Sequence, residues 1–587
     1  MNTLLLLHSV KEAEYCVRRR LHEGCLLLST DPAVDVHLRE TRGIECRSLS
    51  EFLNHEELSS FRAKAATTVD RLLFALDEGV APALNRELGL KMRYFVPLYS
   101  YYGKHYLLGQ IAFVEALRKV VDAQHPLKIR LCRSPYQSFL NVDADLKSLI
   151  GLFLGPVDVE MIDVVVPLGN RLGAIARLRR FLVTRGNGPR IRRALTAIAQ
   201  GLRFKRRGGG RKTILLAEPL YFLDFLRDAL SRYDLLCCGP DGYPEELRAR
   251  DRIAGPAISR EIIDSLARTQ PEGPLDEIFL KAVRQDFTRG ISGYLGPVLT
   301  LKKIQETRPI SLGIWGNIGG FGKYMIFEYL RSEGVSVVGT QHGNSYVDQV
   351  APMIFDSDFS RCDHFVSWGF DKEDLARAFP RARAEMEVHP VGRVAPAPAA
   401  KGRPIDVLYP LCLGLSLFEG GAARTKPDAL LDRQIRILRY LDTLKGRSIY
   451  VKTFPFLPAD RCAVWPILKG LKNVRVAEDL YLDDFLQKYA PRAVVIDYPA
   501  SPLFQTAPLD SEIFMLPDEL NPYEARALKE LEKRVHYCAD AEMLIDRLDS
   551  YFSGRLERRR DDTYLRHYQQ KPNSRENTVR LIEDLAG

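Results

Sequence analysis

The sequence predicts an α/β protein with two Rossmann-like, doubly wound parallel-sheet domains that face each other across a cleft. Short runs of aliphatic and β-branched residues alternate with amphipathic helical patterns along most of the chain, as expected for parallel sheets covered by helices. The length of 587 residues also exceeds what one hydrophobic core organises, so at least two domains are expected.

The N-terminal domain is expected over residues 1–370, with helical insertions between its strands. Its first strand patterns, at 4–7 and 25–29, lead to a turn that contains Asp31. Glu218 follows a third strand pattern, and both carboxylates are candidate catalytic residues because α/β sheets bind ligands beyond the carboxyl ends of strands. The G-x-G-x-x-G fingerprint is absent here, so no dinucleotide cofactor is expected.

The second domain is expected over residues 405–555, after a linker region at 371–404 that includes a Pro- and Ala-rich connector. Residues 556–587 are expected to form a charged C-terminal helix. The second domain alternates strands and helices more regularly than the first, with strand patterns at 406–412, 448–453, 474–477, 493–497 and 512–516.

The composition is that of a soluble globular protein. No apolar run approaches the roughly 18–20 residues that span a bilayer. The N-terminus has neither the basic region nor the cleavage site of a signal peptide, so a cytoplasmic location is predicted. Ten cysteines without a C-x-x-C pair fit neither a disulfide framework nor a zinc site.

The segment 164–212 is strongly basic. It holds no acidic residue and many arginines and lysines, although the net charge of the whole chain is only +9. Within it, residues 172–182 place leucine and isoleucine at helical spacing between arginines, a pattern typical of helices that lie on anionic membranes. A solvated helix face or a mobile insertion explains the pattern equally well, because glycines follow at 208–210.

One histidine stands out because it follows a buried strand pattern. Residues 335–338 form that pattern, and the turn Gln341-His342-Gly343 comes directly after it. Tyr346 and an asparagine add further polar groups, which a purely structural turn does not need. His342 is therefore a candidate catalytic residue, with Gln341 and Gly343 beside it, and the alternative is a histidine that only caps or packs. The tyrosines within 99–103 either line a pocket or pack.

Three loops of the second domain are suited to a phosphate. Gly414 and Ser416 follow the first strand pattern, Lys452 ends the second, and Asp497-Tyr498 ends another where a helix begins at Ser501. Backbone N–H groups, an ammonium and a hydroxyl at one sheet edge would bind a diphosphate or nucleotide. Each residue alone is as well explained by a surface charge or a turn. A nucleotide base is expected near Glu478.

Short motifs along residues 310–550 resemble bacterial GT-B transferases of cell-surface carbohydrates. These include the Q-H-G type surface-carbohydrate biosynthesis proteins, which are related to the CDP-glycerol glycerophosphotransferases. The motifs are Gln341-His342-Gly343, Trp368-Gly369, Val391-Gly392, Lys452 in a K-x-x-P stretch, and Asp497-Tyr498 with Ser501. The chain departs from the pattern after Gly343 and at Pro499-Ala500, so the resemblance leaves the donor and the acceptor open.

The resemblance implies a glycosyltransferase that needs no metal or other cofactor. It would move a sugar from a CMP-, CDP- or UDP-linked donor to a cell-surface polysaccharide or lipid-linked glycan, at the inner face of the bacterial cytoplasmic membrane. His342 would act as a general base or donate to the leaving phosphate, while Lys452 and Ser501 would hold that phosphate.

Three other functions are compared with this one. Glycerophosphotransferase-type polymer synthesis shares the motifs. A nucleotide-sugar 2-epimerase shares the two-domain fold but needs several carboxylates for acid-base work, and few are placed at strand ends. A nucleic-acid-binding protein is the weakest alternative, because the basic segment has few aromatic residues and no base-reading motif accompanies it.

Overall fold

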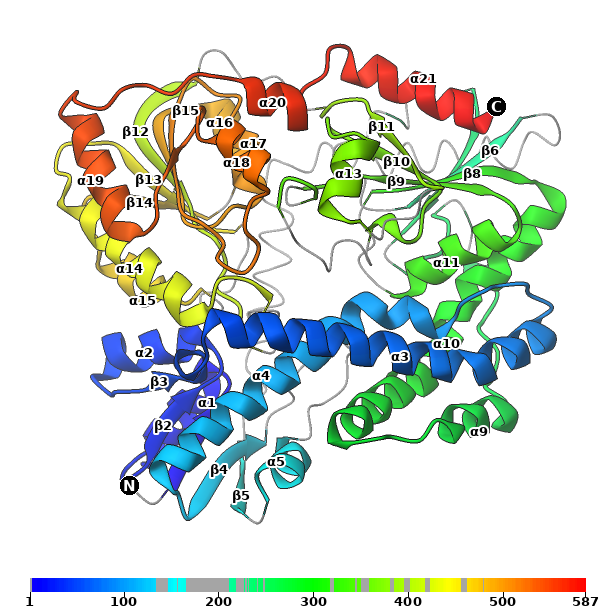
Figure 1. Ribbon diagram of the computed structural model, residues 1–587, viewed down its shortest axis with the longest axis horizontal. Coiled ribbons are helices and arrows are strands. Elements are labelled where there is room, and N and C mark those ends of the chain that lie inside the picture. Colours follow the sequence, from blue (N-terminus) through cyan, green and yellow to red (C-terminus); the bar gives the residue numbers. More distant parts are fainter. Residues whose placement is uncertain are drawn as a thin grey trace.

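The protein, described by a computed structural model, contains three parallel β-sheets with helices packed around them (Figure 1). The structure describes residues 3–133, 146–155, 157–164, 211–217, 226, 230, 232–239, 241–245, 247, 249–316, 321–343, 346–349, 358–380, 385–394, 402–417, 423–454, 462–478 and 480–587. The basic segment predicted at 164–212 lies almost wholly outside these residues, and Glu218 lies outside them.

The N-terminal sheet has the strand order β3-β2-β1-β4-β5, and all its neighbouring strands are parallel. Leu4 and Leu6 enter the main core, whereas Leu5 and Leu7 enter a second core on the opposite face, so the strand is apolar throughout. The elements are β1 (Thr3–Leu7), α1 (Val10–Arg18), β2 (Leu26–Ser29), α2 (Pro32–Arg42), β3 (Arg47–Ser48), η1 (Leu49–Phe52), β4 (Lys128–Arg133), α5 (Leu146–Leu154) and β5 (Asp158–Asp163).

The middle sheet has the order β11-β10-β9-β8-β6-β7 and is likewise parallel. The direction in which strands are added reverses between β6 and β8. Its elements are β6 (Thr213–Ala217), β7 (Asp234–Cys238), η3 (Ala249–Asp251), α9 (Arg260–Arg268), β8 (Ile310–Trp315), α11 (Phe321–Ser332), β9 (Ser336–Thr340), β10 (His364–Ser367), α13 (Lys372–Ala378) and β11 (Glu387–Pro390).

The C-terminal sheet has the order β14-β13-β12-β15-β16-β17, again with parallel neighbours. Its strand order reverses between β12 and β15, which is where such sheets bind ligands. Its elements are β12 (Arg403–Pro410), α14 (Pro427–Thr443), β13 (Ile449–Lys452), α15 (Trp465–Gly470), β14 (Val474–Ala477), α16 (Leu482–Lys488), β15 (Tyr489–Ile496), α17 (Ser501–Thr506), β16 (Glu512–Met515), α18 (Ala525–Leu531), β17 (His536–Tyr537) and α19 (Ala541–Phe552).

Long helices join the three sheets. Helix α3 (His55–Leu88) runs across the molecule below both the middle and the C-terminal sheets, packed against α4 (Ser100–Gln124) (Figure 1). Arg62 of α3 donates to Asn521 of the C-terminal domain, and Arg71 pairs with Asp276 of α10 (Pro274–Thr307). Because α3 contacts both the α10 region and the C-terminal domain, the N-terminal helices lie against both halves of the molecule.

The chain returns to the middle sheet at its end. After α20 (Thr563–Tyr568), helix α21 (Ser574–Ala586) packs Ile582 and Ala586 against Ile214, Leu312 and other residues of the middle sheet (Figure 1). The end of the chain therefore passes from the C-terminal sheet, beside which α20 lies, to the middle sheet, against which α21 packs (Figure 1). This confirms the α/β class and the GT-B arrangement of two doubly wound sheets.

The predicted division of the chain requires three corrections. Residues 1–370 hold two sheets rather than one, because strand pairing is not local and the pattern alone cannot assign strands to sheets. The region 371–404, predicted as a linker, contains α13 and β11, which belong to the middle sheet. Residues 556–587 form two helices rather than one. Among the described helices, none has the length and apolar character required to cross a bilayer.

Candidate active site between the middle and C-terminal sheets

Gln341 fixes the turn that follows β9. It is buried, its side-chain nitrogen donates to the carbonyl of Gly343 at 2.9 Å, and its side-chain oxygen accepts from the backbone N–H of Trp368 at 2.8 Å. The amide thus ties the turn after β9 to the turn after β10. The structure gives this predicted ligand-binding residue a positioning role, because both ends of its amide already bind backbone groups.

His342 is held by a chain of hydrogen bonds. Its Nδ1 lies 2.7 Å from the hydroxyl of Tyr346, and that hydroxyl lies 3.0 Å from Oδ2 of Asp358. Tyr346 is fully buried, and burial, followed by the charge of Asp358, raises its pKa well above 10. The phenol therefore keeps its proton, and it has only one to donate.

The number of protons in this chain of hydrogen bonds determines which ring nitrogen of His342 carries a proton. A carboxylate only accepts, so the phenol of Tyr346 donates to Asp358 and its oxygen accepts from Nδ1–H of His342. The backbone N–H of His342 points to the same oxygen at 3.4 Å. Nε2 of His342 is then left without a proton and has a lone pair, which is the state of a general base.

The turn of His342 meets the C-terminal sheet. A Cβ placed on Gly343 would lie 3.8 Å from the hydroxyl oxygen of Ser501, which is exposed at the start of α17. These two residues come from different sheets and from motifs about 160 positions apart. The structure therefore brings together the predicted residues His342, Gly343 and Ser501.

Asp497 joins two loops at the reversal point of the C-terminal sheet. It is buried and accepts from the hydroxyl of Tyr409 at 2.9 Å, from the side-chain amide of Gln434 at 2.6 Å and from the N–H of Cys412 at 3.3 Å. Burial raises the pKa of Asp497 to about 6. Its carboxylate is thus used within the protein, and it positions the loop that carries Tyr498 rather than offering an oxygen to a ligand.

Arg424 is a cation in the site that the sequence analysis missed. Its guanidinium carbon lies 5.6 Å from the ring centre of Tyr498. The side chain is exposed to solvent, and its charge acts on Tyr101, His105 and Tyr498. The sequence feature that could have identified this cation is the position of Arg424 just after the glycine pair Gly420-Gly421.

Helix α4 carries two residues on which the charge of Arg424 acts. Tyr101 and His105 are half-buried, and burial, followed by the charges of Arg424 and Arg62, lowers the pKa of His105 to about 3. Burial raises the pKa of Tyr101, with further effects from Arg424 and Asp358. Tyr101 therefore lies within electrostatic reach of both Arg424 and the carboxylate that orients His342. The exposed guanidinium of Arg424 beside Tyr498 suits an anionic ligand.

Two predicted phosphate loops pack closely against the protein. Lys452 is 3% exposed and donates to the carbonyl of Thr453. Ser416 is buried, and a Cβ on Gly414 would lie 3.4 Å from Pro32 of the N-terminal domain. These three residues lie at the carboxyl edge of the C-terminal sheet, as predicted, but they contact protein there.

Two of the predicted carboxylates follow other strands: Asp31 comes after β2 and Glu478 after β14. Asp31 caps α2 by accepting from the N–H of Ala33 at 2.8 Å, beside the loop that contains Gly414. Glu478 follows β14 and is exposed. Glu218 lies outside the described residues. Asp31 thus has a structural role that its position in a helix-starting turn before Pro32 explains.

No protein-family model matches the chain, and no curated protein matches its sequence. Solved structures with a similar fold include the UDP-GlcNAc 2-epimerase of Methanocaldococcus jannaschii, at 9% identity and a TM-score of 0.39, over 64% of this chain and 100% of that one. A spinosyn rhamnosyltransferase has 13% identity and a TM-score of 0.31, over 64% and 100%. Phytolacca americana UGT2 has 9% identity and a TM-score of 0.34, over 64% and 100%. Similarity at this level concerns the arrangement of sheets and assigns no reaction to this chain.

Proposed function

We propose that this protein is a metal-independent GT-B glycosyltransferase. It transfers a sugar from a CMP-, CDP- or UDP-linked donor to a cell-surface polysaccharide or a lipid-linked glycan. The observation that carries this proposal is His342, whose Nδ1 is engaged by Tyr346 at 2.7 Å and whose turn meets Ser501 of the opposite sheet. An oriented base on one sheet and cations on the other are the two parts that sugar transfer requires.

In the proposed reaction, Nε2 of His342 takes the proton of an acceptor hydroxyl. The acceptor oxygen forms a bond to the anomeric carbon as the bond from that carbon to the phosphate oxygen breaks. The leaving nucleotide keeps the electron pair, and its new negative charge is stabilised by Arg424, with Lys452 at the same sheet edge. The hydrogen bond from Nδ1–H to Tyr346, backed by Asp358, stabilises the imidazolium that forms.

The carboxylates argue against the epimerase alternative. Epimerisation at a carbon next to the anomeric centre needs acidic groups that contact the sugar. Among the described candidates, Asp31 caps a helix, Glu478 is exposed after β14, and Asp497 accepts three protein hydrogen bonds. Glycerophosphotransferase chemistry shares the base and the cations and differs in the transferred group, so donor identity separates it from sugar transfer.

Nucleotide binding is the first test. The unfolding temperature of the purified protein is measured with CMP, CDP, UDP and GDP, because a ligand bound only by the folded state raises it. We expect one cytidine or uridine nucleotide to stabilise wild type, and the matching sugar donor to release that nucleotide when acceptor is added. Stabilisation by none of the four, together with no nucleotide release from any donor, would refute the proposal.

We also propose that segment 164–212 attaches the enzyme to the anionic inner face of the cytoplasmic membrane, where a lipid-linked acceptor is found. Its many cations and apolar positions support this, since each cation near the headgroups contributes about 1 kcal/mol. Co-sedimentation with vesicles rich in anionic lipid is expected for wild type and is expected to be lost on deletion of the segment. Sedimentation that depends neither on anionic lipid nor on the segment excludes this attachment.

A further inference from the structure

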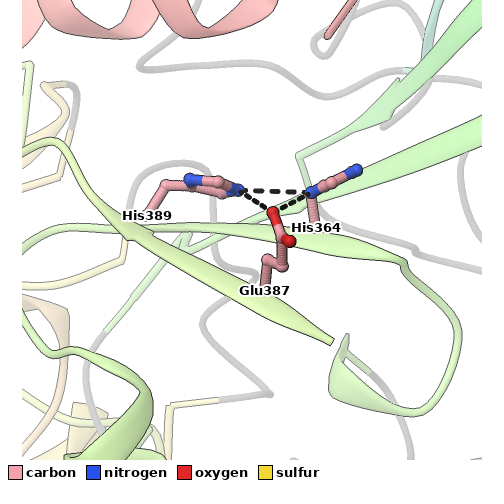
Figure 2. A group of neighbouring side chains, drawn as sticks. All are labelled: His364, Glu387 and His389. Carbon is pink, nitrogen blue, oxygen red and sulfur yellow. Dashed lines mark hydrogen bonds and ion pairs between the residues drawn. The ribbon is translucent and has the colours of Figure 1, made fainter. Parts of the chain in front are cut away.

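The edge of the middle sheet carries two histidines and a glutamate on one face. His364 starts β10, and Glu387 and His389 lie on the neighbouring strand β11. His364 is paired with Glu387, and Val366 with His389. Paired and alternate residues of parallel strands point to the same face, so the register itself brings the three side chains together. Figure 2 shows the two imidazoles and the carboxylate turned toward one another.

The three ligand atoms form a nearly regular triangle. Nδ1 of His364 lies 3.2 Å from Nε2 of His389 and 3.3 Å from Oε2 of Glu387, and Nε2 of His389 lies 3.7 Å from the same oxygen. A tetrahedral zinc ion with bonds of about 2.0–2.1 Å separates its ligand atoms by about 3.3–3.4 Å. The triangle thus has the size of one face of a zinc coordination tetrahedron.

We propose that His364, Glu387 and His389 form a binding site for a divalent transition-metal ion, with Zn²⁺ as the best match. Two imidazoles and one carboxylate favour the zinc, cobalt and nickel class over magnesium or calcium, which prefer oxygen ligands. Water completes the fourth position. Without a metal, the two rings are joined by one hydrogen bond of 3.2 Å, and Glu387 lies beside both of them.

Solvent reaches this site from one side. The side chain of Glu387 is 63% exposed, while those of His364 and His389 are 17% and 23% exposed, so a metal enters from the carboxylate side.

The position of the site indicates a structural use. Strand β11 is the edge strand of the middle sheet, and β10 is its only strand neighbour in that sheet. Val366 and Val391, on the same two strands, pack in the core that includes Ile582 of α21. A metal held by one residue of β10 and two residues of β11 would link these two strands to each other at the edge of the sheet, beside α21. It stands apart from the turns after β9 and β10, so it does not enter the proposed transfer reaction.

The test uses untagged full-length protein freed of metal by a chelator, with Zn²⁺ alone as the probe. Calorimetry is expected to show one zinc per chain, and zinc is expected to raise the unfolding temperature. Loss of a residue that only hydrogen-bonds to a metal ligand weakens metal binding by roughly 10–100-fold. His389→Gln and Glu387→Gln each remove a ligand itself, so each is expected to weaken zinc binding by more than that. His125→Asn, which removes an exposed histidine from outside the site, is the control and is expected to bind zinc as wild type does.

Two readouts separate metal binding from a role in folding. The metal-free variants are expected to unfold cooperatively near the temperature of metal-free wild type. Zinc affinity of wild type is expected to fall as the pH is lowered, because protons compete with zinc for the imidazoles. Failure of wild type to bind one zinc, or equal binding by wild type and His389→Gln, would overturn the proposal.

Discussion

The hydroxyl of Tyr346 is the clearest single group to test, because it links His342 to Asp358. Tyr346→Phe removes the bond of 2.7 Å to Nδ1 of His342 and the bond of 3.0 Å to the carboxylate, while the ring remains. Without the acceptor on Nδ1, the imidazole is free to rotate and to change tautomer. The imidazolium formed during the reaction also loses its partner.

The expected size of the effect follows from these bonds. A hydrogen bond to a charged group is worth about 1.5–3 kcal/mol, which corresponds to roughly 10–150-fold in rate. We therefore expect kcat of Tyr346→Phe to fall by that factor. The KM for the nucleotide donor should change little, because the lost bond acts on the base and not on the donor phosphate.

A matched control separates catalysis from stability. Tyr99 is also fully buried, and its hydroxyl donates to the carboxylate of Asp286 at 2.7 Å, away from His342. Tyr99→Phe should destabilise the fold by a similar amount, about 1–3 kcal/mol for the buried group left unpaired, and leave kcat of the folded enzyme unchanged. Wild-type kcat in Tyr346→Phe, or an equal loss in both variants, refutes the relay.

Three further predictions test the remaining parts. His342→Gln should bind nucleotide and lose about 10²–10⁴-fold in kcat, and near-normal transfer would exclude a base role. Arg424→Gln and Lys452→Ala should each weaken nucleotide binding by roughly 10–150-fold. Lys445→Gln, which changes an exposed lysine, should not weaken it. Wild-type nucleotide affinity in the first two variants would remove both cations from the site. The hydrogen bond from His567 to Asp374, followed by the negative charges of Asp374 and Glu530, raises the pKa of His567. The stability that the charged His567 contributes to the fold is therefore fully present below about pH 6.5 and is lost as the pH rises through the folded-state pKa. Chemical denaturation should show wild type losing stability relative to His567→Gln above that pH, and parallel curves would contradict it.

The sequence predicted the elements of the fold better than their assembly. Strand runs such as Leu4–Leu7 are apolar on both faces, so their type and burial are visible locally. Which strands share a sheet depends on pairing between distant segments, and this is why the N-terminal sheet was not separated from the middle one. The site divides in the same way. His342, Gly343 and Ser501 could be placed at strand ends, and the structure brings them together.

Three of the predicted site residues bind protein groups in the structure. Gln341, Asp31 and Asp497 are polar residues at strand ends, which is also where backbone groups of turns and helix starts need partners. A pattern cannot tell whether such a side chain faces the ligand or the backbone. Arg424 was missed because its loop was judged by its glycines, while its nearness to Tyr101 depends on how α4 packs in the fold.

The segment that orients His342 is itself held by the C-terminal domain. Asp348, two residues after Tyr346, accepts from the N–H of Tyr346 at 3.2 Å with one carboxylate oxygen and from the hydroxyl of Tyr564 at 2.7 Å with the other. Its carbonyl accepts from the N–H of Glu524 at 2.8 Å. Tyr564 and Glu524 come from the domain that carries the cations. The geometry of the base on the middle sheet therefore depends on the C-terminal domain being in place. Under the proposed function, movement of the two domains on nucleotide binding would change the orientation of His342 through this network, and would so link activation of the acceptor to binding of the donor.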